Sequence, residues 1–231
     1  MRAMILAAGR GARMRPLTDT CPKPLLKAGG KSLIARHIER LAQAGFTDIV
    51  INTAWLGHMI EQTLGDGSAW QVRLHYSHEE TALETAGGIA HARPLLGEAP
   101  FLLMNGDIYT DWDPAQAHDA ARRLHDADAD MWLMLVNNPA QHPQGDFSLD
   151  ADGHLLPGGP NALTYAGVAV YHPRLFDSVD PDQAAPMLPL MKQSIAQGRA
   201  IGAHYAGRWA DIGTVDRLAA LDAELSTSLR P

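Results

Sequence analysis

Short apolar runs alternate with amphipathic segments along the first 136 residues. The apolar runs predict strands over residues 3–8, 48–53, 72–77, 101–104 and 131–136. The segments between them predict helices over residues 32–44, 58–64, 85–96 and 113–125, the last opened by Asp113 as an N-cap and Pro114 at the first helical position. Strands that alternate with helices indicate a parallel sheet with helices on both faces and right-handed crossovers.

The pattern changes after residue 137. Prolines and glycines interrupt every short apolar segment between residues 139 and 160, which predicts a hairpin-rich insertion rather than a second domain. A strand over residues 164–171, a helix over 187–197, a strand over 200–205 and a helix over 214–225 complete the pattern. The 231 residues are therefore expected to form a single α/β domain.

Composition excludes several classes of protein. Hydrophobic residues make up 46% of the chain and charged residues 19%, which is a globular balance. No apolar run approaches the roughly 20 residues of a membrane span, and the apolar stretch at the start is too brief for a signal peptide. The single cysteine, Cys21, excludes an internal disulfide and a cysteine-based zinc site. We therefore expect a cytoplasmic protein that binds no membrane.

Charge is distributed unevenly along the chain. Residues 1–31 carry seven basic side chains and one acidic side chain, whereas the remaining residues carry 12 basic and 25 acidic side chains. An excess of acidic residues repels nucleic acid, so we expect no nucleic-acid partner. A local cluster of positive charge in a glycine-rich stretch is typical of a site for a small polyanion such as a nucleoside triphosphate.

The segment LAAGRGARMRPLT follows the first predicted strand. Glycines at the carboxyl end of a strand let backbone N–H groups approach a phosphate, and ligands of open parallel sheets bind at that edge. The segment is not a dinucleotide-binding motif, because Met14 stands where the third glycine is required. It is not an ATPase phosphate loop either, because Leu25 replaces the first glycine of the sequence that ends in Gly30, Lys31 and Ser32.

Basic side chains follow these glycines. Arg10, Arg13 and Arg15 lie in the loop, and Lys23 lies between Pro22 and Pro24, which restrict the backbone around it. A lysine held in this way is suited to an α-phosphate, and an arginine fork is suited to a leaving pyrophosphate.

Six motifs in this order resemble those of the sugar-1-phosphate nucleotidylyltransferases, which make nucleotide sugars from a nucleoside triphosphate. They are LAAGRGARMRPLT, PKPL, LETAGG, NGD, TYAGVAVY and WADIGT, and they span nearly the whole chain. The resemblance implies a Rossmann-like α/β fold, with a mostly parallel central sheet flanked by helices and a small hairpin-rich sugar-binding lobe. Residues 1–136 would form mainly the nucleotide-binding half and residues 137–231 mainly the sugar-binding half.

The resemblance also implies roles for individual residues. The residues that would bind the nucleotide are Leu6, Ala7, Ala8, Gly9, Gly11, Ala12, Arg13, Lys23, Glu79, Glu84 and Thr85. The last three belong to the segment 79–88, which would contact the base. Asn105, Gly145, Asp146 and Tyr165 would lie near the sugar. Arg13, Lys23 and Asp107 would be catalytic, and Asp107 and Asp211 would hold Mg²⁺, a cation that prefers oxygen ligands. Both aspartates follow predicted strands, so we expect them at the same edge of the sheet. Glu84 stands where the family usually has glycine.

Further features narrow the substrate that the resemblance implies. The form LETAGG, the segment HPQGDFSL and the short chain are similar to uridylyltransferases that use UTP and N-acetylmuramate α-1-phosphate in peptidoglycan recycling. Many relatives have Glu-Lys-Pro where this chain has Leu-Pro-Gly-Gly-Pro at residues 156–160. This difference indicates that other residues bind the sugar here. Another sugar 1-phosphate, such as a glucose, N-acetylglucosamine or mannose type, stays open, and so does a silent nucleotide-sugar sensor. The sequence leaves a monomer and a dimer equally open.

Overall fold

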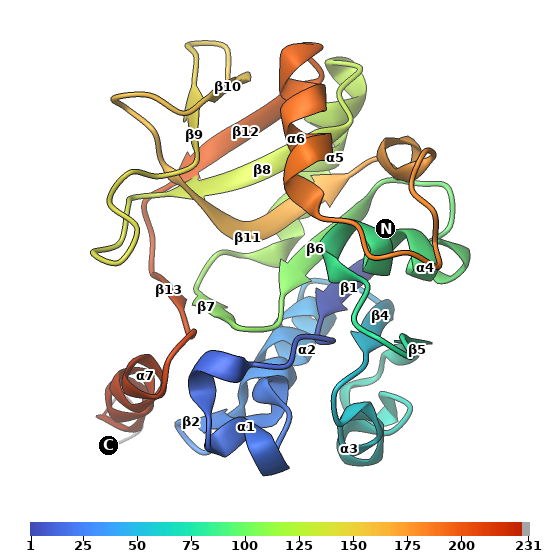
Figure 1. Ribbon diagram of the computed structural model, residues 1–231, viewed down its shortest axis with the longest axis vertical. Coiled ribbons are helices and arrows are strands. Elements are labelled where there is room, and N and C mark those ends of the chain that lie inside the picture. Colours follow the sequence, from blue (N-terminus) through green and yellow to red (C-terminus); the bar gives the residue numbers. More distant parts are fainter. Residues whose placement is uncertain (228–231) are drawn as a thin grey trace.

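A seven-stranded sheet organises the protein, in a computed structural model that describes residues 1–227 (Figure 1). Its order is β12-β8-β11-β6-β1-β4-β5. The strands are β1 (Ala3–Leu6), β4 (Asp48–Thr53), β5 (Arg73–His78), β6 (Phe101–Asn105), β8 (Met131–Val136), β11 (Thr164–Tyr171) and β12 (Ala200–Tyr205). Only β11 runs antiparallel to its neighbours, β6 and β8. The expected mostly parallel sheet is confirmed, although the pattern did not predict the reversed strand.

Helices cover both faces of this sheet. Helices α2 (Leu33–Gln43), α3 (Gly57–Leu64) and α5 (Ala117–Asp126) pack on one face, and α4 (Glu84–Leu96) and α6 (Met187–Ala196) pack on the other. Alternate residues of each strand point to opposite faces. Thus Ile5 of β1 joins the cluster with α2, whereas Met4 joins the cluster with α4. Burial on both faces explains why the strands are nearly continuous apolar runs.

A third hydrophobic cluster lies beyond the main sheet. Helix α7 (Val215–Thr227) packs through Leu218 and Leu221 against Met14 of the glycine-rich loop and Leu33 of α2. Near it lie α1 (Leu17–Thr20), β2 (Lys27–Ala28) and β3 (Lys31–Ser32). This packing attaches the last helix to the first loop, as the lower part of Figure 1 shows.

Short elements were not predicted. Strands β7 (Ile108–Thr110) and β13 (Trp209–Asp211) pair with each other outside the main sheet. Single-turn 3₁₀ helices span Ala12–Met14, Lys23–Leu25, Ser68–Trp70, Pro114–Gln116 and Pro173–Phe176. Two to four residues are too few to show a hydrophobic period, so these elements left no signal. The expected hairpin after residue 137 is confirmed as β9 (Phe147–Leu149) paired with β10 (Leu155–Pro157).

Several predicted boundaries differ from the structure by one or two residues. Two of the differences have a clear physical reason. The first strand ends at Leu6 rather than at residue 8, because the chain leaves the sheet to enter the glycine-rich loop. The predicted helix over residues 113–125 begins as a 3₁₀ turn, with Asp113 accepting a hydrogen bond from the Ala115 N–H, and becomes α-helical at Ala117. Within residues 1–227, no helix is long and apolar enough to cross a membrane.

Candidate active site

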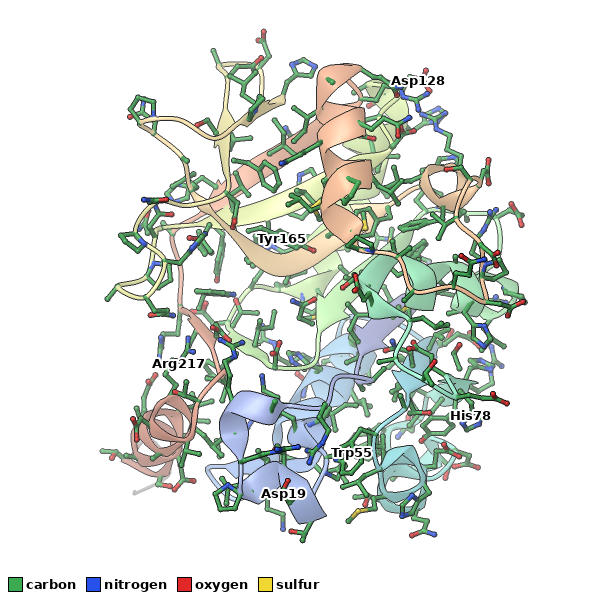
Figure 2. All side chains as sticks on the ribbon, viewed as in Figure 1. Asp19, Trp55, His78, Asp128, Tyr165 and Arg217 are labelled. Atoms are coloured by element: carbon green, nitrogen blue, oxygen red, sulfur yellow. The ribbon has the colours of Figure 1, made fainter. Side chains whose placement is uncertain are left out.

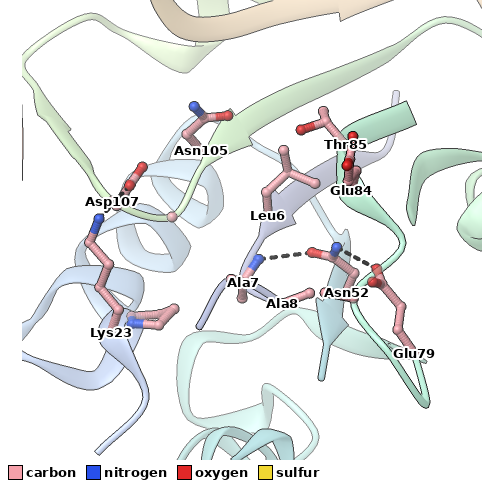
Figure 3. Close-up of a pocket in the computed structure, with 14 residues that line it drawn as sticks. Leu6, Ala7, Ala8, Lys23, Asn52, Glu79, Glu84, Thr85, Asn105 and Asp107 are labelled. Atoms are coloured by element: carbon pink, nitrogen blue, oxygen red, sulfur yellow. Dashed lines mark hydrogen bonds and ion pairs between the residues drawn. The ribbon is translucent and has the colours of Figure 1, made fainter. Parts of the chain in front are cut away.

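Adjoining cavities open at the carboxyl ends of β1, β4 and β6, the edge where open parallel sheets bind ligands. The first cavity encloses about 230 Å³. It is lined by Leu6, Ala7, Ala8, Gly9, Lys23, Pro24, Asn52, Glu79, Ala82, Glu84, Thr85, Asn105, Gly106 and Asp107 (Figure 3). The structure therefore brings together most of the residues predicted for the nucleotide.

The arginines of the glycine-rich loop divide into two groups. Arg10 and Arg15 both contact Asp19, and the Arg10 guanidinium lies 3.8 Å from the centre of the Trp55 ring. These two arginines stabilise the loop itself. Arg13 instead lines a small cavity with Gly9, Gly11, Ala12, Lys23, Asp107 and Gly213. Only one of the three basic side chains thus reaches the space where an anion would lie.

Lys23 lies at the centre of the site. The 3₁₀ turn Lys23–Leu25, entered through Pro22, buries the side chain until only 8% of the residue is exposed. Its Nζ atom lies 2.5 Å from Oδ2 of Asp107. A lysine this deeply buried needs an anionic partner, and the Asp107 carboxylate supplies it.

Asp107 is presented by the turn that follows β6. The Gly106 N–H donates to the Leu6 carbonyl at 2.9 Å, and a Cβ atom at position 106 would lie 2.5 Å from that oxygen. Only glycine permits this contact between the ends of β6 and β1. It turns the chain so that Asp107 lines the same cavities as Lys23 and Arg13.

Asp211 reaches the site by a route that the pattern did not predict. It was expected to follow a strand of the main sheet, but it ends β13, where it is opposite Ile108 of β7. The Ile212 N–H also donates to the Asp107 carbonyl at 2.8 Å. The Asp211 carboxylate lies 2.5 Å from Arg217 of α7, a residue labelled in Figure 2. Both predicted metal ligands therefore line one cavity.

This second cavity holds three of the four residues predicted for the sugar. It is lined by Arg13, Asn105, Asp107, Ile108, Pro139, Gln141, His142, Asp146, Thr164, Tyr165, Ala166, Gly167, Trp209 and Asp211. The Asp146 carboxylate accepts hydrogen bonds from the Tyr165 N–H at 2.8 Å and contacts His142 Nε2 at 3.0 Å. Gly145 lies in the turn that precedes Asp146 and does not line the cavity.

A bulge in β11 shapes the wall between the sheet and this cavity. The pairing of β11 with β8 shifts between Tyr165 and Ala169, and Gly167 adopts φ +73° there. A Cβ atom at position 167 would lie 2.6 Å from the Asn105 amide nitrogen. Gly167 thus gives Asn105 room at the end of β6.

A third cavity, mainly apolar, lies between β11 and α6. It is lined by Thr85, Asn105, Asp146, Phe147, Tyr165, Tyr171, Met187, Leu188 and Met191. Figure 2 shows Tyr165 beside α6. Burial raises the pKa of Tyr165 to about 12, so its hydroxyl keeps its proton at neutral pH. Tyr171 and the α6 residues were not predicted as site residues, because a hydrophobic period does not distinguish a pocket wall from the core.

The segment predicted to contact the base forms the opposite wall of the first cavity. Glu84, at the first position of α4, has a backbone φ of +58°, which residues other than glycine rarely adopt. Glu79 is only 6% exposed, and its two carboxylate oxygens accept hydrogen bonds from Asn52 Nδ2 and the Leu83 N–H. Asn52 was not predicted, because asparagine inside a strand pattern carries no motif.

The donor set suits a hard cation that shares its ligands with a substrate. Asp107 and Asp211 supply carboxylate oxygens to one cavity. No group of three or more His, Cys, Asp or Glu side chains in residues 1–227 could hold a metal by itself. Mg²⁺ is usually bound through one or two carboxylates together with phosphate and water, so these residues fit it. With Arg13 and Lys23 beside them, the cavities are suited to phosphorylated ligands.

Comparisons with known proteins agree with this geometry. The family profile described as nucleotidyl transferase matches residues 2–228. An N-acetylmuramate α-1-phosphate uridylyltransferase of Neisseria meningitidis is 53% identical, over 94% of this chain and 95% of that protein. A protein of the same description from Caulobacter vibrioides is 36% identical, over 97% and 96%. The fold matches a glucose-1-phosphate thymidylyltransferase structure described as putative, from Bacillus anthracis, with a TM-score of 0.85 and 19% identity, over 98% of this chain and 96% of that one.

Proposed function

Because the chain belongs to the nucleotidyl transferase family, we propose that it transfers UMP from UTP to N-acetylmuramate α-1-phosphate. An anionic oxygen of the sugar phosphate attacks the α-phosphorus of UTP. The bond between the α-phosphorus and its bridging oxygen breaks, and pyrophosphate leaves with the electron pair. The products are UDP-N-acetylmuramate and pyrophosphate. The observation that carries the proposal is the convergence of Lys23, Arg13, Asp107 and Asp211 on adjoining cavities.

The nucleotide occupies the first cavity in this proposal. The uracil and ribose lie between the start of the glycine-rich loop and the segment with Glu84 and Thr85, which line opposite sides. The triphosphate extends toward Gly11, Ala12 and Arg13. Lys23 neutralises charge on the α-phosphate, and Arg13 binds the leaving pyrophosphate. Charge stabilisation of this kind, with positioning, supplies most of the catalysis in phosphoryl and nucleotidyl transfer.

The sugar phosphate occupies the second cavity, on the other side of Asp107. Asn105, Asp146 and Tyr165, which line this cavity, would contact the sugar ring. The Tyr165 hydroxyl lies 3.4 Å from the Tyr171 hydroxyl and, because it keeps its proton, is able to donate a hydrogen bond. The third cavity shares these three residues and extends the site toward Met187 and Met191. An apolar extension suits an acyl substituent such as the acetamido methyl group. Residues 156–160, which replace the Glu-Lys-Pro of many relatives, line none of these cavities.

Asp107 and Asp211 would hold Mg²⁺ in this scheme, and the cation would neutralise phosphate charge during the transfer. Before substrates bind, Lys23 and Arg217 neutralise these two carboxylates. The ion pairs keep both aspartates in place without a ligand.

A cytoplasmic location and the division into nucleotide and sugar halves stay predictions from the sequence.

Pyrophosphate release is the experiment that tests this proposal. The purified protein is given Mg²⁺, each of the four ribonucleoside triphosphates, and N-acetylmuramate α-1-phosphate, with N-acetylglucosamine 1-phosphate and glucose 1-phosphate in parallel. We expect the highest kcat/KM with UTP and N-acetylmuramate α-1-phosphate. Preference for another sugar would overturn the substrate and leave the class of reaction. Binding of nucleotide without pyrophosphate release would overturn the reaction itself.

A further inference from the structure

A buried hydrogen-bonded bridge joins the two walls of the first cavity. The Ala7 N–H donates to Asn52 Oδ1 at 2.8 Å, and Asn52 Nδ2 donates to Glu79 Oε1 at 2.7 Å. The Leu83 N–H donates to Glu79 Oε2 at 2.8 Å. Figure 3 shows the first two of these contacts across the floor of the cavity. The bridge therefore runs from the glycine-rich loop to the segment with Glu84.

Neither side chain of the bridge has much contact with solvent. Asn52 is 3% exposed and Glu79 is 6% exposed. A Cβ atom on Gly88 of α4 would lie 2.6 Å from Glu79 Oε1 and 3.1 Å from Asn52 Nδ2, so the helix packs closely over the pair. In the wild type, position 52 offers one acceptor and one donor and position 79 offers two acceptors, so every group of the bridge has a partner. Burial makes a mismatch in this pattern costly.

We propose that Asn52 and Glu79 are positioning residues that set the distance between the two walls that hold the nucleoside. Glu79 was expected to contact the base, but both of its carboxylate oxygens are engaged within the protein. The bridge acts on the nucleotide through the Ala7 backbone and through the segment that ends at Glu84. This inference rests on the proposed function, because it takes the first cavity to be the nucleotide site.

Reciprocal substitution tests the bridge. In Asn52→Asp, two carboxylates face each other, and in Glu79→Gln, the new amide opposes one of the two N–H donors. In the double variant, the carboxylate at position 52 accepts from the Ala7 N–H and from the amide at position 79. The amide oxygen at position 79 still accepts from the Leu83 N–H. The double variant thus keeps every hydrogen bond with one of the three donations reversed.

The affinity for UTP with Mg²⁺ is measured by calorimetry, after circular dichroism has shown which variants fold. We expect each single variant to raise the Kd for UTP at least about 10-fold, and the double variant to return within about 3-fold of the wild type. In turnover, the KM for UTP should rise more than kcat falls, and the KM for the sugar phosphate should stay unchanged. Ser194→Ala is the control, because Ser194 donates a buried hydrogen bond to Asp130 at 3.1 Å and lines none of the three cavities. It should lower the melting temperature only.

Each outcome decides between the two proposals. A wild type that binds no UTP overturns the proposed function. A wild type that binds UTP, with single variants that bind equally well, overturns the bridge. If the single variants do not fold, the double variant decides. A double variant that binds UTP with wild-type affinity supports the bridge. A double variant that folds but binds UTP weakly, or that fails to fold, contradicts it.

Discussion

Individual side chains in the site combine two demands, since the same residues must fold and must bind anions. Lys23 and Asp107 illustrate this, because they neutralise each other and also face the cavities. Glu84 illustrates the conflict, because its backbone has a positive φ that glycine would adopt without strain. Residues that break a local rule often lie at functional sites, which makes them informative targets.

Removing the Asp107 charge should impair catalysis more than folding. We expect Asp107→Asn to lower kcat by about 10²-fold or more, as loss of a principal electrostatic group does. Initial rates of pyrophosphate release at saturating substrates measure this. Asp126→Asn, at an exposed position at the end of α5, is the matched control and should keep the wild-type rate. Near-normal turnover of Asp107→Asn would exclude its proposed role.

Two substitutions of Glu84 separate backbone strain from side-chain function. In an ordinary helix, alanine is more stable than glycine by about 1 kcal/mol. With φ +58° at position 84, we expect the reverse order, Glu84→Gly exceeding Glu84→Ala by roughly 1 kcal/mol in the free energy of unfolding. Urea denaturation measures this difference. Both variants lose the carboxylate, so a shared rise in the KM for UTP would report the side chain; a more stable Glu84→Ala would contradict the strain.

Helices and strands differ in what they contribute to the site. Strands β1, β4 and β6 end at the first cavity, while the reversed strand β11 and helix α6 enclose the third. The β7–β13 pair brings Asp211 beside Asp107. The site therefore depends on the long elements for its walls and on the short β7–β13 pair for the position of Asp211 beside Asp107.

Filling the third cavity should weaken sugar binding alone. Leu188 of α6 lines this cavity and is 49% exposed, so a larger side chain there is tolerated by the fold. We expect Leu188→Trp to raise the KM for the sugar phosphate about 10-fold or more, equivalent to about 1.4 kcal/mol, without changing the KM for UTP. Leu156→Trp is the control, since Leu156 is 43% exposed on β10 and lines none of the three cavities. Equal effects of both variants on the sugar KM would contradict the pocket.

The main sheet is continuous across the whole molecule, so the protein is expected to unfold as a single cooperative unit. Strand β11, from the predicted sugar half, pairs with β6 from the predicted nucleotide half. The hydrophobic clusters on both faces also combine residues from before and after residue 137. The two predicted halves therefore share one core.

Ligand binding should stabilise this single core and require the cation. We expect one thermal transition, with coincident midpoints by far-ultraviolet circular dichroism and tryptophan fluorescence. UTP with Mg²⁺ should raise the free energy of unfolding, by about 2.7 kcal/mol at a ligand concentration 100 times the Kd. Chelation with EDTA should remove most of this stabilisation. Two separate thermal transitions would contradict the shared core. An equal stabilisation by UTP in the presence of EDTA would contradict the role of the cation.

Local chemistry made much of the fold and part of the site predictable. Strands 48–53, 131–136, 164–171 and 200–205 agree with the structure, because buried strands are apolar along their length. The predicted helix over residues 32–44 agrees with α2 to within one residue, and Ser32 caps it with its hydroxyl accepting a hydrogen bond from the Ala35 N–H. The glycine-rich loop, Lys23 and Asp107 stood out because their motifs are contiguous in the chain.

Contacts between distant segments could be decided only in the folded chain. Which arginine of the loop faces the cavity depends on Asp19, and the position of Asp211 depends on the pairing of β13 with β7. The Asn52–Glu79 bridge joins residues 27 positions apart, and the α6 residues that line the third cavity belong to none of the motifs. A sequence pattern records the local preferences of neighbouring residues, whereas these features arise from packing between segments that meet only in the folded chain.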